Sequence, residues 1–232
     1  MAIRPVFVIS NSSPYYEEKS ISFEYYNGFA EIQKKKSIKS LHEAFLKQFP
    51  NHKVLEISSK SEDELGVQLS AFNLKIKTNN QKEYSVESAF QASKVFEHGG
   101  PYKDLLDKSS REAKKDPRLK ESGRLQNFYF GKRFFPLFPT TYFYNWLYIN
   151  SLHFYPDLES QLMKYTSFTD IAFNPDKSIN CQAKAAAVYV SLRKKGILEQ
   201  AIENKDTFLN MVYGEIKPVY NTELQFSLWD KL

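Results

Sequence analysis

The chain of 232 residues contains little glycine or proline, with eight glycines and ten prolines, and a single cysteine, Cys181. So few glycines and prolines exclude collagen-like, low-complexity and linker-rich classes. One cysteine excludes an internal disulfide and is typical of proteins in a reducing compartment. No apolar run approaches the roughly 20 residues that a membrane helix needs, and the first residues lack the pattern of a secretory signal. We therefore expect a soluble, cytoplasmic protein.

The sequence also lacks the signatures of several cofactor and metal sites. It contains no G-x-G-x-x-G, no G-x-x-x-x-G-K-S/T and no G-x-S-x-G, which excludes the common dinucleotide, NTP and serine-hydrolase motifs. The four histidines, His42, His52, His98 and His153, show no zinc-ligand spacing. We expect no cofactor and no metal. Cys181 is interpreted as a buried structural thiol at a helix start, with a nucleophilic role as the alternative.

Aromatic and basic residues are abundant instead. Aromatics make up 16% of the chain, Lys plus Arg exceed Asp plus Glu by 32 to 27, and the sequence pI is near 9.0. Because cations meet phosphates and rings stack on bases, this composition favours a nucleic-acid partner. The alternative is an aromatic core beneath an ordinary lysine-rich surface.

The positive charge is concentrated in two blocks. Residues 103–133 hold ten Lys or Arg and five Asp or Glu, an excess equal to the net charge of the whole chain. The second block is the run of three lysines at 34–36 together with Lys39. Either block could be a solvated face, but two blocks favour a polyanionic partner. The residues that we expect to contact DNA are Lys34, Lys35, Lys36, Lys114, Lys115 and Arg118.

Hydrophobic periodicity predicts an α+β fold that is predominantly helical, with short strands. The expected strands are residues 6–9, 21–26, 54–57 and 72–76, the last followed by a turn at Asn79-Asn80. In the first half of the chain we expect a helix capped by Ser37, a helix from Ser85 to about Gly99 and a polar helix over 102–115. In the second half we expect a helix capped by Thr140 or Thr141, one that begins at Asp157, one over 182–195 and one over 198–212.

A polar stripe on the helix that begins at Ser85 points to chemistry. On a helix, Glu87, Gln91 and Lys94 fall at i, i+4 and i+7, and the helix dipole favours an ionised carboxylate in the first turn. Such a carboxylate beside an ammonium can activate water or stabilise a developing cation. The alternative is a solvent-facing stripe with a weak salt bridge.

Two further polar segments are candidates for a site. Residues 56–61, Glu-Ile-Ser-Ser-Lys-Ser, follow an expected strand, where loop side chains converge. Residues 168–180 lead into the alanine-rich helix, and Ser178 and Asn180 near its N-terminus suit a phosphate or a sugar hydroxyl. Capping of that helix by either side chain is the alternative.

These segments resemble a known family. The segment Leu69-Ser-Ala-Phe72 is similar to the S-N-F element of the NADAR (YbiA-like) family. The segment Val86-Glu-Ser-Ala-Phe-Gln-Ala-Ser-Lys94 is similar to the E-H-x-F-Q-x-x-K helix of that family. Asp170, with Asn180 before a helix, is similar to its late W-G-x-G…N segment. The flanking segments 33–42, 55–61, 94–102 and 178–182 resemble the branch encoded beside DarT-type DNA ADP-ribosyltransferase toxins. The similarity runs from about Arg4 to about Phe208.

The resemblance implies a NADAR-like single domain, with residues 54–215 as the catalytic core. Residues 1–53 would be an N-terminal extension of strands and one helix packed on that core, and residues 216–232 a C-terminal tail. The implied function is that of a glycohydrolase that removes ADP-ribose from guanine bases in DNA. Such an enzyme is the antitoxin to a guanine-modifying DarT-type toxin, its functional partner.

The resemblance also assigns residues. Glu87 matches the catalytic glutamate and Lys94 the helix lysine, while Ser70 and Phe72 match the element that lines the ligand site. Three positions depart from the family pattern: Ala71 replaces Asn, Ser88 replaces His, and Phe168-Thr-Asp170 replaces the W-G-x-G-like loop. The residues expected to contact ADP-ribose or the base are Ser70, Phe72, Gln91, Phe173, Asn174, Ser178 and Asn180.

The implied chemistry is physically reasonable. Cleavage of an N-glycosidic bond builds positive charge on the anomeric carbon, which Glu87 can stabilise while it orients or deprotonates water. The leaving guanine needs a proton donor, and Lys94, Lys60 and Asp170 are candidates. A lysine could instead attack the opened ribose and form an imine. The modified base must leave the duplex or arrive on a single strand, which the basic blocks would hold.

Two other functions remain open at this point. One is an N-glycosidase that acts on a free ribosylated metabolite. The other is a non-catalytic antitoxin that binds ADP-ribosylated nucleic acid or the toxin itself. The basic blocks favour ADP-ribosylated DNA over a metabolite, and Glu87 with Lys94 favours an enzyme over a binding module. No membrane partner is expected.

Overall fold

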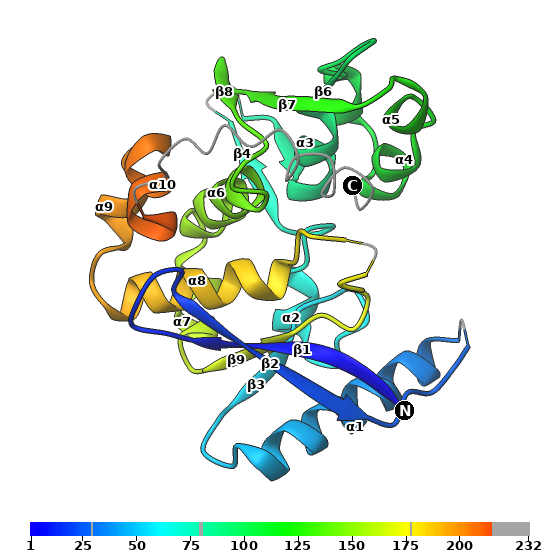
Figure 1. Cartoon of the computed structure of the whole chain (residues 1–232), viewed down its shortest axis with the longest axis vertical. Helices are drawn as coiled ribbons and strands as arrows, with labels where there is room; N and C mark the ends of the chain where they lie inside the picture. The colour runs from blue at the N-terminus through cyan, green and yellow to red at the C-terminus, as the bar shows by residue number, and fades with distance from the viewer. Residues whose placement is uncertain (29, 79–80, 177, 215–232) are drawn as a thin grey trace. The chain divides into compact units, whose positions relative to one another are not determined.

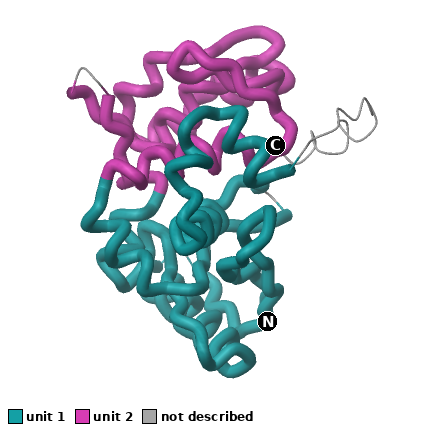
Figure 2. Tube along the Cα trace, turned by 90° about the vertical axis from the view of Figure 1, so that its left-hand side faces the viewer, with its two compact units in different colours: residues 1–70, 155–232 teal, residues 71–154 magenta. Residues whose placement is uncertain are grey.

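The computed structural model describes residues 1–28, 30–78, 81–176 and 178–214, and it has the expected α+β fold with more helix than strand (Figure 1). The described chain forms two compact units: unit 1 contains residues 1–70 and 155–214, and unit 2 contains residues 71–154 (Figure 2). The expected N-terminal extension supplies two strands and a helix to unit 1. The expected tail lies outside the described residues. Across the described ranges, no helix combines the length and apolarity that a bilayer crossing requires.

Unit 1 is built on a four-stranded sheet with the strand order β2-β1-β9-β3. Strands β1 and β2 form an antiparallel hairpin, and β9 lies between β1 and β3, antiparallel to the first and parallel to the second. The elements of unit 1 are β1 (Ala2–Ile9), β2 (Tyr16–Phe23), α1 (Glu31–Gln48), β3 (Val54–Glu56), α2 (Glu64–Gln68), α7 (Pro156–Leu162), β9 (Ser167–Thr169), α8 (Gln182–Lys194), α9 (Leu198–Ile202) and α10 (Lys205–Tyr213).

Helices cover both faces of β1, which explains why its apolar residues are buried at consecutive positions. Val6 and Val8 belong to one apolar cluster with Phe45 of α1. Phe7, between them, points to the other face, where the ammonium of Lys184 on α8 lies 5.2 Å from its ring centroid. A strand with two covered faces has a continuous apolar run rather than an alternating one.

Two expected helix boundaries in unit 1 are wrong. Helix α1 begins at Glu31 rather than after Ser37, because the Gln and Lys residues between them are good helix formers. Ser37 is buried inside the helix, where its hydroxyl accepts the N–H of Tyr26 at 3.0 Å. The helix expected over 198–212 is two helices, because the side chain of Asn204 accepts two N–H groups and caps a new start.

Unit 2 combines a three-stranded antiparallel sheet, in the order β6-β7-β8, with the hairpin β4–β5 and helices. Phe90 of α3, Phe128 of β7 and Phe143 of α6 form its aromatic core, with ring centroids 4.8 to 6.0 Å apart. Part of the aromatic excess therefore packs inside the protein. The elements of unit 2 are β4 (Lys75–Lys77), β5 (Glu83–Ser85), α3 (Val86–Ala92), β6 (Lys94–Phe96), the 3₁₀ helix η1 (Lys103–Asp107), α4 (Ser110–Lys115), α5 (Arg118–Glu121), β7 (Leu125–Phe130), β8 (Arg133–Phe135) and α6 (Tyr142–His153).

Two helix expectations in unit 2 are also wrong. The helix that begins after Ser85 ends at Ala92, so Lys94 lies on strand β6 and not on the helix. The turn after β6 requires Gly100, which has a φ of +85° and whose Cβ, if present, would lie 2.3 Å from the carbonyl oxygen of Lys94. The polar helix expected over 102–115 is interrupted and forms η1 and α4.

The hairpin β7–β8 was not predicted, although the sequence carries a signal for it. Gly131 and Lys132 both have positive φ, as in the two-residue turns that match the twist of a hairpin. These two residues stand between the aromatic runs of β7 and β8. The strand expected over 72–76 begins only at Lys75, as β4, and the turn expected at 79–80 lies outside the described residues.

The remaining expectations for secondary structure are confirmed. The strands expected over 6–9, 21–26 and 54–57 overlap β1, β2 and β3, and the helices expected after Thr141, near Asp157 and over 182–195 are α6, α7 and α8. Ser85 caps α3 by accepting the N–H of Ser88 at 3.0 Å.

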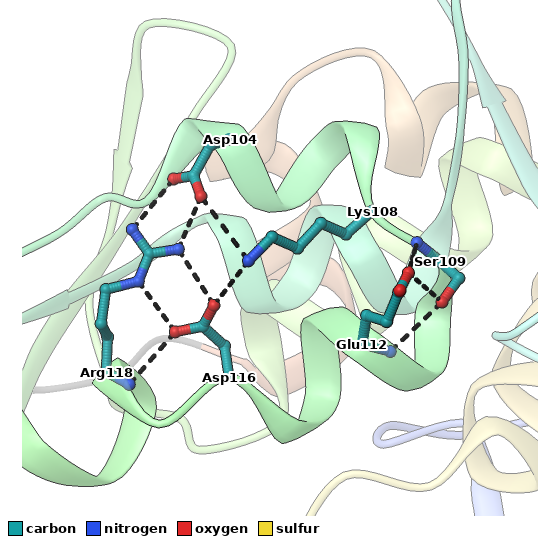
Figure 3. A network of polar contacts seen from close by, with 6 residues as sticks. All are labelled: Asp104, Lys108, Ser109, Glu112, Asp116 and Arg118. Carbon is teal, nitrogen blue, oxygen red and sulfur yellow. Dashed lines mark hydrogen bonds and ion pairs between the residues drawn. The ribbon is translucent and has the colours of Figure 1, made fainter.

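A charged network ties η1, α4 and α5 together in unit 2 (Figure 3). The guanidinium of Arg118 contacts both Asp104 and Asp116, and the ammonium of Lys108 lies 2.8 Å from Asp116. The Asp116 side chain is only 5% exposed, so these donors replace its water. Arg118 first and Lys108 second hold the pKa of the Asp116 carboxyl well below its usual range.

We predict that Asp116→Asn lowers the free energy of unfolding at pH 7 by about 1–2 kcal/mol, because a buried carboxylate loses its charge-assisted hydrogen bonds to partly exposed partners. A carboxyl with a lowered folded-state pKa stabilises the fold above about pH 4, and this stabilisation is lost as the pH falls. The difference in the free energy of unfolding between Asp116→Asn and the wild type should therefore be smaller at pH 3 than at pH 7. Urea denaturation at both pH values measures it. The control is Glu121→Gln, which removes one negative charge at an exposed position. Equal losses of stability in the two variants would contradict the prediction.

Candidate functional site

The first turn of α3 is fastened to the segment that contains Ala71 and Phe72. The N–H of Glu87 donates to the carbonyl oxygen of Ala71 at 2.9 Å. The hydroxyl of Ser110, at the start of α4, donates to the carbonyl oxygen of Phe72 at 2.9 Å. The segment Ala71-Phe72, helix α3 and helix α4 therefore meet in one place, although they are separated in sequence.

The carboxylate of Glu87 is buried rather than solvent-facing. Its side chain is 7% exposed, and its Oε1 accepts a hydrogen bond from Gln91 Nε2 at 2.8 Å. The ammonium of Lys114 lies 3.6 Å from the same oxygen. Among the described residues both contacts fall on Oε1, so Oε2 is available to a ligand. The alternative of an exposed stripe with a weak salt bridge is wrong for Glu87 and Gln91.

Lys94 lies close to this carboxylate although it is not on the same helix. Its ammonium sits 5.1 Å from the ring centroid of Phe90, on α3. Burial lowers the pKa of Lys94 to about 8, the Glu87 carboxylate opposes that change, and the Lys114 ammonium adds to it. An amine with this pKa exchanges its proton near neutral pH, which an ordinary lysine does not.

Lys114 joins the site from a basic segment that we expected to contact DNA. It lies on α4, a short helix whose first turn is closed by reciprocal hydrogen bonds between Ser109 and Glu112 (Figure 3). Besides pairing with Glu87, its ammonium lies 5.4 Å from the ring centroid of Phe72. Its side chain is 56% exposed, so the ion pair with the buried carboxylate of Glu87 is open to solvent on the lysine side. No local pattern in the sequence links Lys114 to Glu87.

The other residues expected in the site belong to unit 1. Lys60 lies 4.0 Å from the carboxylate of Glu31, and the hydroxyl of Ser70 donates to the carbonyl oxygen of Val67 at 2.7 Å. Asp170 accepts the N–H groups of the two residues that follow Ile171. Their approach to Glu87 stays a prediction.

The loop after β9 is organised by its own short contacts. Phe173 is buried, with its ring 6.3 Å from the ring of Phe7. Asn174 accepts the N–H of residue 176, and the hydroxyl of Ser178 donates to the carbonyl oxygen of Asn180. Neither Ser178 nor Asn180 caps α8 with its side chain, since the N-cap residue is Cys181, so the capping alternative is wrong. Their contact with a ligand stays a prediction.

A comparison with known families identifies the chain. The model of the DarT1-associated NADAR antitoxin family matches residues 2–221. The chain belongs to this family. No curated protein matches it. The resemblance inferred from the motifs is thereby confirmed. Membership assigns an antitoxin role, linked to a DarT toxin, within a family that has N-glycosidase-like hydrolase activity.

Two departures of this NADAR antitoxin from the family motifs have a structural explanation. Ala71 contributes its carbonyl oxygen to the N–H of Glu87, a contact that does not require the side chain of asparagine. Ser88, which replaces histidine, is buried, and its hydroxyl donates to the carbonyl oxygen of Lys108 at 3.0 Å. It therefore fastens α3 to the C-cap residue of η1.

Five of the six basic residues expected to bind DNA already have partners within their own units. Lys34 hydrogen-bonds the hydroxyl of Tyr25, Lys35 lies 3.3 Å from Glu31, and Lys36 lies 5.9 Å from the ring of Tyr26. In unit 2, Arg118 is held by Asp104 and Asp116, Lys114 pairs with Glu87, and Lys115 is exposed. Their contact with DNA stays a prediction, and part of their charge is neutralised locally.

Within each unit, the described residues offer no second candidate site, either in a cavity or as a group of metal ligands. A cavity of about 380 Å³ in unit 2 and one of about 480 Å³ in unit 1 are lined by residues other than Glu87 and Lys94. Within the described ranges, no three His, Cys, Asp or Glu side chains are grouped so that they could hold a metal ion. Cys181 is buried, and burial raises the pKa of its thiol well above the usual value, which suits the structural interpretation.

Glu56 organises the loop that carries Asp170. Its two carboxylate oxygens accept the hydroxyl of Thr169 at 2.6 Å and the N–H of Ile171 at 2.8 Å, the residues on either side of Asp170. His42 adds a hydrogen bond to Thr169 at 2.8 Å, and burial lowers the pKa of His42 to about 4, so it is neutral at pH 7. Burial raises the pKa of Glu56, and its hydrogen bonds oppose that change. Sequence reasoning had placed the segment near a site but had not recognised this structural role.

We predict that Glu56→Ala lowers the free energy of unfolding by about 2–4 kcal/mol, because it leaves a buried N–H and a buried hydroxyl without their acceptor. Glu62→Ala, an exposed change in the same connection, should cost less than about 0.5 kcal/mol. Urea denaturation of the two variants measures both values. Equal free energies of unfolding for the two variants would show that the hydrogen bonds of Glu56 to Thr169 and Ile171 contribute little to stability.

Proposed function

We propose that this antitoxin is an ADP-ribosylglycohydrolase that removes ADP-ribose from guanine bases of DNA by hydrolysing the N-glycosidic bond. The observation that supports this most directly is the buried carboxylate of Glu87, with one oxygen held by Gln91 and Lys114 and the other available. Lys94, an amine with a pKa of about 8, lies beside it. The family's association with a DarT toxin and its N-glycosidase-like activity agree with this chemistry.

Glu87 has the properties that the transition state requires. Departure of the base leaves positive charge on the anomeric carbon of the ribose, in an oxocarbenium-like state. A carboxylate in a partly desolvated site stabilises that charge more strongly than one in water. Gln91 fixes the rotamer by binding Oε1, so that Oε2 can face the anomeric carbon or orient the attacking water.

Lys94 can serve the leaving base or the sugar. As an ammonium, it can donate a proton to the departing guanine, which is a poor leaving group as an anion. As a neutral amine, it can attack C1 of the opened ribose; the bond from C1 to the guanine nitrogen breaks, that nitrogen takes up a proton, and water then hydrolyses the resulting lysine imine to free the amine and ADP-ribose. Lys60 and Asp170 are the other proposed proton donors, and Phe72 is a proposed stacking surface for a base.

We predict that Glu87→Gln lowers turnover of an ADP-ribosylated guanine oligonucleotide by roughly 100-fold or more and leaves binding within a few-fold, because shape is kept and charge is lost. The assay follows free ADP-ribose and restored guanine. Glu83→Gln, an exposed change on neighbouring β5, is the control and should behave as the wild type.

Each other outcome of this assay points to a different function. Full activity of Glu87→Gln would falsify the role of Glu87. Release of ribose from free ribosylated metabolites but not from the oligonucleotide would indicate a metabolite N-glycosidase. Binding of the modified oligonucleotide without release, in the wild type, would indicate a non-catalytic antitoxin.

We also predict that the rate constant kcat/KM changes with pH around a midpoint near 8, because Lys94 titrates there. A rate that falls above the midpoint identifies the ammonium as proton donor, and a rate that rises toward it identifies the neutral amine as nucleophile. Borohydride during turnover traps the enzyme covalently only in the second case. Lys94→Met should lose the titration, whereas Lys120→Met, at an exposed position of α5, should retain it. A wild-type profile that is flat through pH 8 contradicts the prediction.

A further inference from the structure

The buried carboxylate of Glu87 forms its ion pair with Lys114 of α4 and not with Lys94, which lies near it on β6. The ammonium of Lys114 is 3.6 Å from Oε1 of Glu87. Burial and the charge of Glu87 both act on Lys94, but among the described residues its ammonium makes no ion pair with that carboxylate. The cation that Glu87 engages therefore comes from outside the motif that runs from Glu87 to Lys94.

Two contacts of Ser110 fix the direction in which Lys114 points. The hydroxyl of Ser110, the first residue of α4, lies 2.7 Å from the hydroxyl oxygen of Ser85, which caps α3. It donates to the carbonyl oxygen of Phe72 at 2.9 Å. Lys114 follows Ser110 by four residues, so the two side chains lie on the same face of α4. The ammonium of Lys114 is therefore held between Glu87 and the ring of Phe72, 5.4 Å from the ring centroid.

Few other charges in unit 2 face Lys94. Glu87 and Lys114 are the two charges that act on its pKa, after burial. Strand β7, which pairs with β6, and helix α6 carry no Asp, Glu, Lys or Arg. Arg133 of β8 shares the Lys94 face of the sheet, but its guanidinium lies over the ring of Trp146. The remaining charged residues of β5, η1 and α4 are exposed: Glu83, Lys103, Asp104, Asp107, Arg111, Glu112 and Lys115.

The choice of partner decides what Glu87 and Lys94 can each do. A carboxylate in direct contact with an ammonium stabilises the proton on that ammonium and is itself covered by it. An ion pair between Glu87 and Lys94 would hold the proton of Lys94 and occupy the carboxylate that the anomeric carbon needs. Because Lys114 already satisfies Oε1, Glu87 does not require Lys94 as its partner. The Lys114 ammonium also adds to the lowering of the Lys94 pKa.

We infer that Lys114 is a positioning residue: its ion pair keeps the carboxylate of Glu87 apart from the amine of Lys94, so that the two groups act on a substrate separately. The reaction that the two groups serve rests on the proposed function. The arrangement of the three charges belongs to the free protein, so it can be measured without turnover.

The first test measures the protonation of Lys94 by NMR, with lysines labelled with ¹³C at Cε and the Lys94 signal assigned by its loss in Lys94→Met. In the wild type the midpoint of this titration should lie at about 8. Lys114→Met should raise the midpoint by about one unit, because the repelling ammonium is gone and Glu87 becomes free to stabilise the proton on Lys94. Lys114→Gln, a second neutral variant, should show the same rise.

Two variants separate this ion pair from general effects of charge and packing. Arg111→Met removes a positive charge from an exposed position of the same helix and should leave the midpoint at about 8. Lys114→Arg keeps the charge beside Glu87 and should keep the wild-type midpoint. Thermal melting checks the fold of each variant, and the 56% exposure of the Lys114 side chain favours tolerance of the changes.

In the proposed hydrolase the same change should appear in the kinetics. The pH midpoint of kcat/KM for the ADP-ribosylated guanine oligonucleotide should rise in Lys114→Met by the amount seen by NMR, and Lys114→Arg should restore it. A higher KM with an unchanged midpoint would make Lys114 a DNA contact and contradict the positioning role.

The NMR titration separates failure of this inference from failure of the proposed function. An unchanged midpoint in both neutral variants, with thermal melting like that of the wild type, overturns the inference. So does an equal rise in Arg111→Met, which would reduce the effect to one of overall charge. A wild type that releases no ADP-ribose contradicts the proposed function, and the titration then still decides whether Lys114 separates Glu87 from Lys94.

Discussion

The burial of the Glu87 carboxylate is the constraint around which unit 2 is organised. A buried carboxylate is costly unless donors replace the water that it loses, and Gln91 and Lys114 supply them. To bring Lys114 there, α4 must pack beside α3, and the backbone contact of Glu87 with Ala71 sets where α3 begins. The same packing buries Lys94 and lowers its pKa. The proposed chemistry depends on this arrangement.

Three buried carboxylates in the described chain differ in how their oxygens are used, and the difference separates structure from chemistry. Both oxygens of Glu56 and both oxygens of Asp116 accept hydrogen bonds from protein donors, so these groups hold loops and short helices in place. Glu87 engages only one oxygen with described residues. A carboxylate that is positioned but not saturated can still act on a substrate, which is why we assign catalysis to Glu87.

The basic character of the chain is less directly a DNA-binding surface than composition indicates. Arg118 neutralises two aspartates, Lys114 neutralises Glu87, and Lys34 hydrogen-bonds a tyrosine, so much of this charge acts inside its own unit. Lys132 and Arg133 form no ion pair with a described residue, and the guanidinium of Arg133 lies 5.8 Å from the ring centroid of the buried Trp146.

Sequence alone determined the α+β class, most long helices and the family, because these depend on local periodicity, capping and contiguous motifs. It misplaced Lys94 on a helix and missed β7, β8 and β9, because short strands are stabilised by partners distant in the chain. It also assigned Arg118 and Lys114 to contact with DNA without foreseeing their ion pairs, since the sequence does not show which carboxylate a basic side chain will meet. Only the tertiary structure decided which charges are neutralised and which oxygen is available, because burial and pairing arise when segments far apart in sequence pack together.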